Sequence, residues 1–236
     1  PGDLSQFTLE ELKADEKVTF NQSMMLINTE HLLQNDYVAD LSSYNNTDLQ
    51  MNCCIHDAYK ELSSAVNSET GSKLYVSSAY RTYEEQLEQY EKDSDTATVA
   101  GASEHQTGLA LDLYVAYNAG FNFIKTEAGR FVNSNCWEYG FIIRYPSYGQ
   151  DETGIKYEPW HIRYVGAPHA KIIYNNQLTL EEYILSLKDN VWYEIDGYLI
   201  SRQMPGDNAS LTLPNKYSSA VISPDNTGSY IITIKK

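Results

Sequence analysis

The sequence predicts an α+β fold with a small β-rich unit at its C-terminal end. Two observations support this prediction. Segments with helical spacing and segments rich in β-branched and aromatic residues are interspersed between residues 54 and 187, whereas strand-forming and turn-forming residues dominate from Val191 onward. We therefore expect a boundary near Asp189, with one domain over residues 1–189 and a small β-rich subdomain over residues 190–236.

Helices are predicted where apolar residues recur every three or four positions. Such spacing marks residues 54–67, 83–90, 127–139 and 180–187. Gly71 and Gly140 follow the first and third of these segments as stop signals. The last segment is preceded by Thr179, with Glu182 three residues later, which is the sequence pattern of a capping box.

Strands are predicted in short apolar stretches outside these helices. They cover residues 24–27, 74–79, 109–115, 141–145 and 160–165. Residues 94–102 and 150–156 are small or polar and are interpreted as loops. In the C-terminal unit, residues 219–222 and 230–234 flank a Pro-Asp-Asn-Thr-Gly turn, a pattern that predicts a hairpin.

The composition argues against several classes of protein. A formal net charge of −15 repels phosphate backbones and therefore disfavours nucleic-acid binding. No run of about 18 apolar residues, the length of a membrane-spanning helix, is present. The three cysteines are an odd number and do not form a disulfide framework. We expect buried thiols, and one disulfide between Cys136 and either Cys53 or Cys54 stays open.

Residues that bind metals and carry protons gather in two stretches. His105 precedes the apolar strand at 109–115, Asp112 lies within it, and Glu158 and His161 lie at the last core strand. Two imidazoles and one carboxylate can hold a zinc ion whose fourth position is left to water. Glu158, three residues before His161, is near enough to accept a proton from that water. A buried Asp needs a partner, and a cation is one such partner.

The same residues resemble the motifs of a known family. Ser103-x-His105-x-x-Gly108-x-Ala110-x-Asp112, followed by Glu158-x-Trp160-His161, is similar to the VanY-type D-alanyl-D-alanine carboxypeptidases. The upstream segment 77–86, which contains Arg81, also matches, and the resemblance covers residues 15–187. These enzymes belong to a larger group of zinc peptidases, which includes VanX-type D,D-dipeptidases and L,D-carboxypeptidases.

The resemblance implies a small central antiparallel sheet with flanking helices that carries a zinc site. His105, Asp112 and His161 would be the zinc ligands, and Glu158 would be the catalytic base. Arg81 would stabilise the oxyanion at the scissile carbonyl, a role that suits a permanent cation with a planar fork of donors.

The resemblance also implies contacts with the substrate. Ser103 and Gln86 would help to bind its terminal carboxylate and backbone, and Trp160 would form a wall of the site. The expected substrate is a peptidoglycan stem peptide or its lipid-linked precursor. We expect no nucleic-acid partner.

The implied activity is that of a zinc-dependent D,D-carboxypeptidase, which removes the terminal D-alanine and so deprives glycopeptide antibiotics of their target. An L,D-carboxypeptidase that trims tetrapeptides shares every motif and stays open. A D,D-dipeptidase is disfavoured, because the run His105-Gln-Thr-Gly108 is more similar to the carboxypeptidases. A non-catalytic wall-binding module would have no use for Glu158 beside a complete set of ligands.

The substrate implies an extracytoplasmic location at the bacterial cell surface. Because the chain begins with Pro1 rather than Met, we also expect that an N-terminal signal or membrane anchor has been removed. The role of the β-rich segment 190–236 and the oligomeric state are not indicated by any motif.

Overall fold

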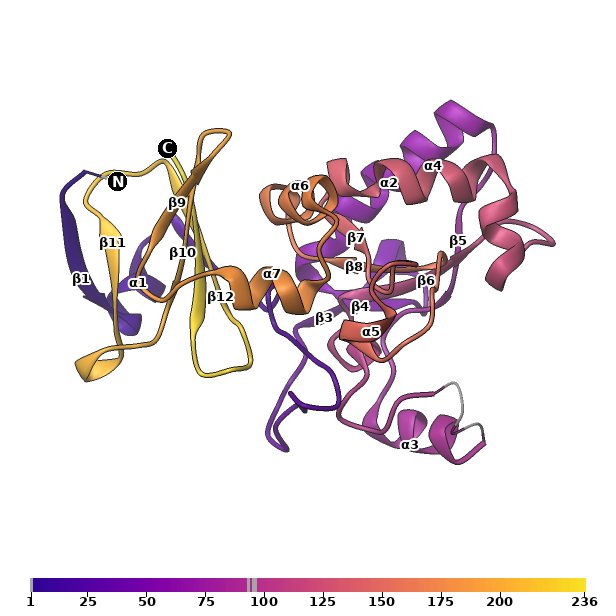
Figure 1. Ribbon diagram of the computed structural model, residues 1–236, viewed down its shortest axis with the longest axis horizontal. Coiled ribbons are helices and arrows are strands. Elements are labelled where there is room, and N and C mark those ends of the chain that lie inside the picture. Colours follow the sequence, from indigo (N-terminus) through magenta and orange to yellow (C-terminus); the bar gives the residue numbers. More distant parts are fainter. Residues whose placement is uncertain (1, 93, 95–96) are drawn as a thin grey trace. The chain divides into compact units, whose positions relative to one another are not determined.

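The chain folds into two compact units in the computed structural model, which describes residues 2–92, 94 and 97–236 (Figure 1). The larger one, here called the core unit, is Ile27–Glu182. The smaller one, here called the terminal unit, combines Pro1–Leu26 with Tyr183–Lys236. Helices and antiparallel sheets occur together, so the predicted α+β fold class is confirmed.

The core unit is built on a four-stranded antiparallel sheet with the strand order β5–β6–β8–β7. Its strands are β5 (Tyr75–Ser78), β6 (Ala110–Tyr114), β7 (Phe141–Ile143) and β8 (His161–Tyr164). Each of them lies within a strand predicted from the sequence. A separate antiparallel pair is formed by β3 (Leu41–Ser43) and β4 (Gln50–Asn52).

Helices surround this sheet (Figure 1). The α-helices of the core unit are α2 (His56–Thr70), α3 (Tyr83–Lys92), α4 (Glu127–Asn135), α5 (Gln150–Thr153) and α6 (Ala167–Asn176). Short 3-10 turns are η1 (Tyr44–Asn46), η2 (Cys53–Ile55), η3 (Glu104–Thr107), η4 (Gly120–Lys125) and η5 (Cys136–Tyr139). Within the described residues, no helix has both the length and the apolar character needed to cross a membrane.

The two faces of the core sheet have different surroundings. Side chains alternate along a strand, and Leu111, Phe141 and Ile162 share one face, where they join Leu62 of α2 and Val132 of α4 in the main hydrophobic core. The alternate positions on β6 and β8 are Ala110, Asp112, His161 and Arg163. The sheet therefore packs one face against helices and presents polar side chains on the other.

The terminal unit contains a five-stranded sheet with the order β2–β12–β13–β10–β9 and the antiparallel pair β1–β11. Its elements are β1 (Leu4–Thr8), α1 (Leu9–Ala14), β2 (Val18–Phe20), β9 (Trp192–Ile195), β10 (Tyr198–Gln203), η6 (Asp207–Ala209), β11 (Ser210–Pro214), β12 (Ser219–Pro224) and β13 (Tyr230–Lys235). Leu12, Leu213, Ile222 and Ile232 lie in its hydrophobic core. The antiparallel pair β12–β13 confirms the predicted hairpin.

The division into units differs from the expected one. Residues 1–26 do not belong to the expected domain 1–189, because β2 pairs in parallel with β12 and β1 pairs with β11. The boundary lies at Tyr183, within α7 (Leu180–Ser186), and not at Asp189. Pairing between strands so far apart in the sequence leaves no trace in local periodicity, which is why it was not predicted.

Three local features also differ. Residues 24–27 are not a strand but a buried connection, in which the backbone N–H of Leu26 donates to the carbonyl oxygen of Asp225 at 3.0 Å. Residues 150–156, expected to be a loop, begin with the one-turn helix α5. The helix α6 is not predicted by the sequence analysis, although Pro168 in its first turn is a helix start signal.

The capping box predicted before α7 is present. The backbone N–H of Glu182 donates to Thr179 Oγ1 at 3.2 Å, and the backbone N–H of Thr179 donates to Glu182 Oε2 at 2.7 Å. The cysteines Cys53, Cys54 and Cys136 are all free, so the disulfide that the sequence leaves open is not formed. Cys136 is a buried thiol, as expected, whereas Cys53 is exposed.

His169 in α6 makes the stability of the fold depend on pH. Its side chain is 3% exposed, and burial lowers its pKa from the ordinary 6.5 to about 3. Between these pH values the unfolded chain binds a proton that the folded chain does not, so stability decreases as the pH falls below about 6.5. We expect His169 to lower the free energy of unfolding by about 1.4 kcal/mol per pH unit in this window.

Urea unfolding of the wild type and of His169→Gln, measured between about pH 7 and about pH 5, checks this prediction. The variant should lose this part of the pH dependence while other acidic groups keep theirs. Equal slopes in the two proteins would contradict it.

Candidate metal centre

The polar face of the core sheet brings Asp112 and His161 together. The two residues are direct partners in the antiparallel register of β6 and β8. Side chains that are directly opposite on one face of a sheet are neighbours, and Asp112 Oδ1 lies 3.0 Å from His161 Nδ1. This contact is therefore a consequence of the strand register.

His105 reaches this pair from η3, the turn just before β6. Its Nδ1 lies 2.7 Å from the carbonyl oxygen of Ala79 and donates to it, so that Nε2 faces Asp112, 3.3 Å from Oδ2. Gly108 turns the chain from η3 into β6 with a φ of +68°. A Cβ at this position would lie 2.7 Å from the backbone nitrogen of Asn52, so only glycine fits here.

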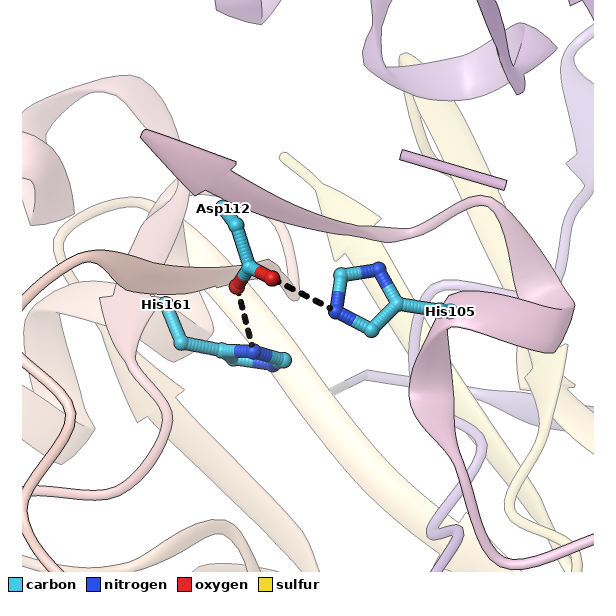
Figure 2. A group of neighbouring side chains, drawn as sticks. All are labelled: His105, Asp112 and His161. Carbon is cyan, nitrogen blue, oxygen red and sulfur yellow. Dashed lines mark ion pairs between the residues drawn. The ribbon is translucent and has the colours of Figure 1, made fainter. Parts of the chain in front are cut away.

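These three side chains are arranged to hold a cation. One possible ligand atom from each of His105, Asp112 and His161 lies within 4.8 Å of the other two (Figure 2). Asp112 Oδ1 is buried, and within the described part of the chain it makes no hydrogen bond. Buried polar atoms left in this way are expected where a ligand is bound.

The electrostatics of the cluster also favour a positive charge. Burial acts to raise the pKa of Asp112, but His105 and His161 outweigh it and hold this pKa well below its usual range. Burial acts to lower the pKa of His161, but the nearby carboxylates of Asp112 and Glu104 raise it to about 10. A carboxylate that favours a proton on a neighbouring imidazole can instead bind a metal ion together with that imidazole.

Glu158 lies beside the cluster at the start of the turn into β8. Its backbone N–H donates to the carbonyl oxygen of Tyr145 at 3.0 Å, and its Oε2 lies 3.6 Å from His161 Nδ1. Burial raises the pKa of its carboxyl group. Glu158 and the three cluster residues line one pocket of about 150 Å³. A carboxylate in this position can exchange a proton with a molecule bound at the cluster.

The other site residues predicted from the sequence line the same pocket: Arg81, Gln86, Ser103 and Trp160. Arg81 donates through Nη1 to Gln86 Oε1 at 2.7 Å and through Nη2 to Ser78 Oγ at 2.9 Å. The buried Gln86 in turn donates through Nε2 to the carbonyl oxygen of Thr98 at 2.7 Å. The amide of Gln86 thus helps to orient Arg81, and its expected contact with substrate stays a prediction.

Aromatic rings form part of the pocket wall. Trp160 packs edge-on against Phe121, with ring centroids 5.0 Å apart. Tyr145, which the sequence analysis does not single out, lines the pocket and places its ring centroid 4.9 Å from that of His161. Ser103 is buried just before η3. The pocket lining therefore combines charged groups with aromatic rings.

Comparison with known proteins agrees with this geometry. The family described as "VanY: D-alanyl-D-alanine carboxypeptidase" matches residues 48–167. The D-alanyl-D-alanine carboxypeptidase of Enterococcus faecium is 30% identical, in an alignment that covers 98% of this chain and 80% of that protein. The chain belongs to the VanY family. The protein YodJ of Bacillus subtilis (strain 168) is 43% identical over 56% of this chain, and the match spans only 52% of YodJ.

Solved structures related to the VanY family resemble the chain as well. The vancomycin-resistance D,D-dipeptidase VanXYg, in complex with a D-Ala-D-Ala phosphinate analogue, has 25% identity and a TM-score of 0.79 and covers 99% of both chains. A VanY D,D-pentapeptidase from a VanB-type resistance cassette, in complex with Zn(II), has 31% identity and a TM-score of 0.60 over 69% of this chain and 98% of that chain. The L,D-carboxypeptidase LdcB has 34% identity and a TM-score of 0.61 over 69% of this chain and 86% of that chain.

The ligand atoms of the cluster are chemically suited to the metal ion found in the VanY structure. Imidazole nitrogens and a carboxylate oxygen are ordinary zinc ligands, and three protein ligands leave a fourth position open in catalytic sites. His105, Asp112 and His161 supply such a set, and a bound ion would account for the buried Asp112 Oδ1, which has no hydrogen bond within the described residues. This cluster is the candidate zinc site of the VanY-family chain.

A buried ionic network, which no sequence motif predicts, lies behind His161 in this VanY-family chain. Glu104 Oε1 accepts from Arg144 Nε at 2.7 Å and from Arg163 Nη1 at 2.5 Å. Arg144 also donates to both carboxylate oxygens of Glu181, at 2.6 and 2.8 Å. All four side chains of the network are buried. An arginine inside each of two apolar strands is the signal that could have revealed it, because a buried charge needs a partner.

Proposed function

We propose that this chain is a zinc-dependent D,D-carboxypeptidase that removes the terminal D-alanine from peptidoglycan stem peptides or their precursors. The observation that carries the proposal is the His105–Asp112–His161 cluster with Glu158 beside it, in a pocket that Arg81 also lines. Metal-assisted hydrolysis of a peptide bond requires a cation site, a proton acceptor and a fixed cationic donor.

Each part has a chemical role. Bound zinc supplies Lewis acidity toward water and toward a carbonyl oxygen. Glu158 accepts the proton of the attacking water and delivers it to the leaving amine, for which its position 3.6 Å from His161 Nδ1 is suited. Its raised pKa makes the carboxyl group a better proton acceptor once it is ionised.

Arg81 serves as the fixed cation of the pocket. Its guanidinium is held by Gln86 and by Ser78 Oγ, so little ordering is required when negative charge develops on the substrate. In this position it stabilises the oxyanion at the scissile carbonyl. Ser103 contributes to binding of the terminal carboxylate, and Trp160 supports the flanking part of the peptide.

The proposed substrate places the protein in the peptidoglycan layer. D-Ala-D-Ala ends of stem peptides lie outside the cytoplasmic membrane in mature wall and in translocated precursors, and we therefore propose an extracytoplasmic location. Removal of the last D-alanine would lower the number of D-Ala-D-Ala targets of glycopeptide antibiotics. The VanY and VanXYg relatives named above are described as vancomycin-resistance proteins, which supports this link.

A second candidate activity is supported by the likeness to LdcB, which is described as an L,D-carboxypeptidase. That reaction uses the same hydrolytic machinery on a stem peptide that has already lost one D-alanine. A dipeptidase activity is supported in the same way by the likeness to VanXYg. The three activities differ in which peptide end fits the pocket.

Three substrates separate these activities: a peptide ending in Lys-D-Ala-D-Ala, one ending in Lys-D-Ala, and free D-Ala-D-Ala. D-Alanine release is measured with the zinc-loaded protein and after removal of zinc by a chelator. We expect release from the first peptide, loss of that release on chelation, and recovery when zinc is restored. Release from the second peptide alone, or from the free dipeptide alone, would replace the proposal by the corresponding alternative.

A protein that binds zinc and cleaves none of the three would overturn the enzymatic proposal. It would then be a wall-binding module, and binding of the uncleaved stem peptides would be the measurement to make.

A further inference from the structure

The two imidazoles of the zinc site face Asp112 with different nitrogens. His105 uses Nε2, and its Nδ1–H is satisfied by the carbonyl oxygen of Ala79 at 2.7 Å. His161 uses Nδ1, which lies 3.0 Å from Asp112 Oδ1 (Figure 2). Its outer nitrogen, Nε2, points into the protein and lies 3.8 Å from Glu104 Oε2. His161 Nε2 thus faces a carboxylate, whereas His105 Nδ1 faces a backbone carbonyl.

His161 Nε2 and Glu104 Oε2, which face each other, both lack a hydrogen bond in the described part of the chain. Glu104 Oε1 accepts from Arg144 and Arg163, whereas Oε2 accepts from no group in the described ranges 2–92, 94 and 97–236. His161 Nε2 is likewise buried without a hydrogen bond in that part of the chain. One of the two atoms is an acceptor, and the other is a donor whenever Nδ1 is the nitrogen that binds metal. An approach of less than about 1 Å would turn the contact into a hydrogen bond.

We propose that Glu104 is a positioning residue of the zinc site, whose Oε2 accepts the Nε2–H hydrogen bond of His161 when His161 Nδ1 binds the metal. This inference rests on the zinc site of the proposed function. A carboxylate partner fixes the tautomer and the ring orientation of a ligating imidazole, and it makes the imidazole a stronger ligand. Arg144 and Arg163 hold Glu104 in place through its other oxygen, so Oε2 stays directed at His161.

The rival explanation is that Glu104 only neutralises two buried arginines. The chain offers a matched control for this explanation, because Glu181 is also a buried carboxylate on Arg144 but makes no contact with His161 in any interaction described above. Glu104→Gln and Glu181→Gln each remove one negative charge from the same guanidinium. Only the first also replaces the acceptor that faces His161 Nε2, because an amide can turn its NH₂ group toward that nitrogen.

The test is the zinc dissociation constant of the full chain, measured by competition with a chelating dye. We expect Glu104→Gln to weaken zinc binding by about 10-fold to 100-fold, the range found for partners of ligating histidines. Glu181→Gln should change it by less than about 3-fold, although both variants lose stability in the metal-free state. Equal changes in zinc affinity would overturn the inference and leave Glu104 a structural partner of the arginines.

A second measurement uses the wild-type protein, so the inference stays testable if Glu104→Gln does not fold. In nitrogen-15 NMR spectra of the zinc-loaded chain, His161 should carry its proton on Nε2, with slow exchange and a strongly deshielded proton. His105 should carry its proton on Nδ1. A proton on Nδ1 of His161, or an Nε2 proton that exchanges freely with water, would contradict the inference.

The proposed function and the role of Glu104 can be disproved separately. If the wild-type chain binds no zinc, the proposed function fails before Glu104 is tested. If it binds zinc and cleaves the stem peptide, but the two variants have the same zinc affinity, only the role of Glu104 is lost.

Discussion

Glu158→Ala is expected to abolish nearly all D-alanine release while the protein still binds zinc. Glu158 lies in the zinc pocket but is not one of the three clustered ligands, and its Oε2 is 3.6 Å from His161 Nδ1. A positioned acid–base group contributes roughly 10²-fold to 10⁴-fold to the rate of a reaction. We expect a decrease in kcat of that size, with the zinc dissociation constant changed by less than about 10-fold.

Two further variants test whether the loss of activity comes from the missing proton acceptor. Glu158→Gln keeps the shape of the side chain but cannot accept the proton, so it should be nearly as inactive as the alanine variant. Glu152→Ala removes an exposed carboxylate of α5 from the same loop region and should leave the rate unchanged. Retention of most activity in Glu158→Ala would show that another group is the base, and loss of zinc would show that Glu158 acts as a ligand.

Gly108→Ala is expected to have the largest effect on stability. The Cβ would lie 2.6 Å from Leu41 Cδ2 and 2.7 Å from the backbone nitrogen of Asn52, in a residue whose φ is +68°. A left-handed conformation costs a residue with a Cβ roughly 1–2 kcal/mol, and overpacking costs roughly 1–3 kcal/mol more. The expected loss is therefore about 2–5 kcal/mol in the free energy of unfolding.

Gly71→Ala is the matched control for this variant. Gly71 ends α2 with the same φ of +68°, but a Cβ there meets no atom within 4 Å. Urea unfolding of both variants therefore separates the conformational cost, which they share, from the close approach to Asn52, which only Gly108 has. Because Gly108 lies between His105 and Asp112, we also expect only Gly108→Ala to weaken zinc binding. Equal losses of stability would contradict the role assigned to the close approach.

The candidate zinc site could be predicted from the sequence because its residues are chemically unusual for their surroundings. Asp112 interrupts an apolar strand, His105 precedes that strand, and His161 lies near the start of another. The resemblance to the VanY-type motifs then selected them together with Glu158 and Arg81. What the sequence does not contain is the register that makes Asp112 and His161 direct partners, since pairing between strands is set by packing of the whole sheet.

The residues that support the site were less predictable. Glu104 stands next to His105 in the motif, but its partner Arg144 directly follows β7 and its partner Arg163 lies in β8. The sequence predicts a substrate contact for Gln86 but not the hydrogen bonds of its amide with Arg81 and Thr98. Contacts of this kind depend on three-dimensional packing, for which composition and periodicity carry no information.

The same limit applies to the fold. The main strands and amphipathic helices were predicted because one of their faces is buried, which imposes a period on the sequence. Helix α6 and the buried connection at residues 24–27 lack a clear period, and the strands near the N-terminus are short. Their structure follows from partners elsewhere in the chain: Leu26, for example, is bonded to Asp225.

The make-up of the terminal unit from two distant segments has a consequence for the order in which the units fold. The core unit is a continuous stretch, Ile27–Glu182, and can fold without residues outside that stretch. In the terminal unit, Val18 has to pair with Ala220, its partner in β12. Contacts across such a long separation form slowly. The strands that precede the core unit therefore stay unpaired until the strands that follow it are in place.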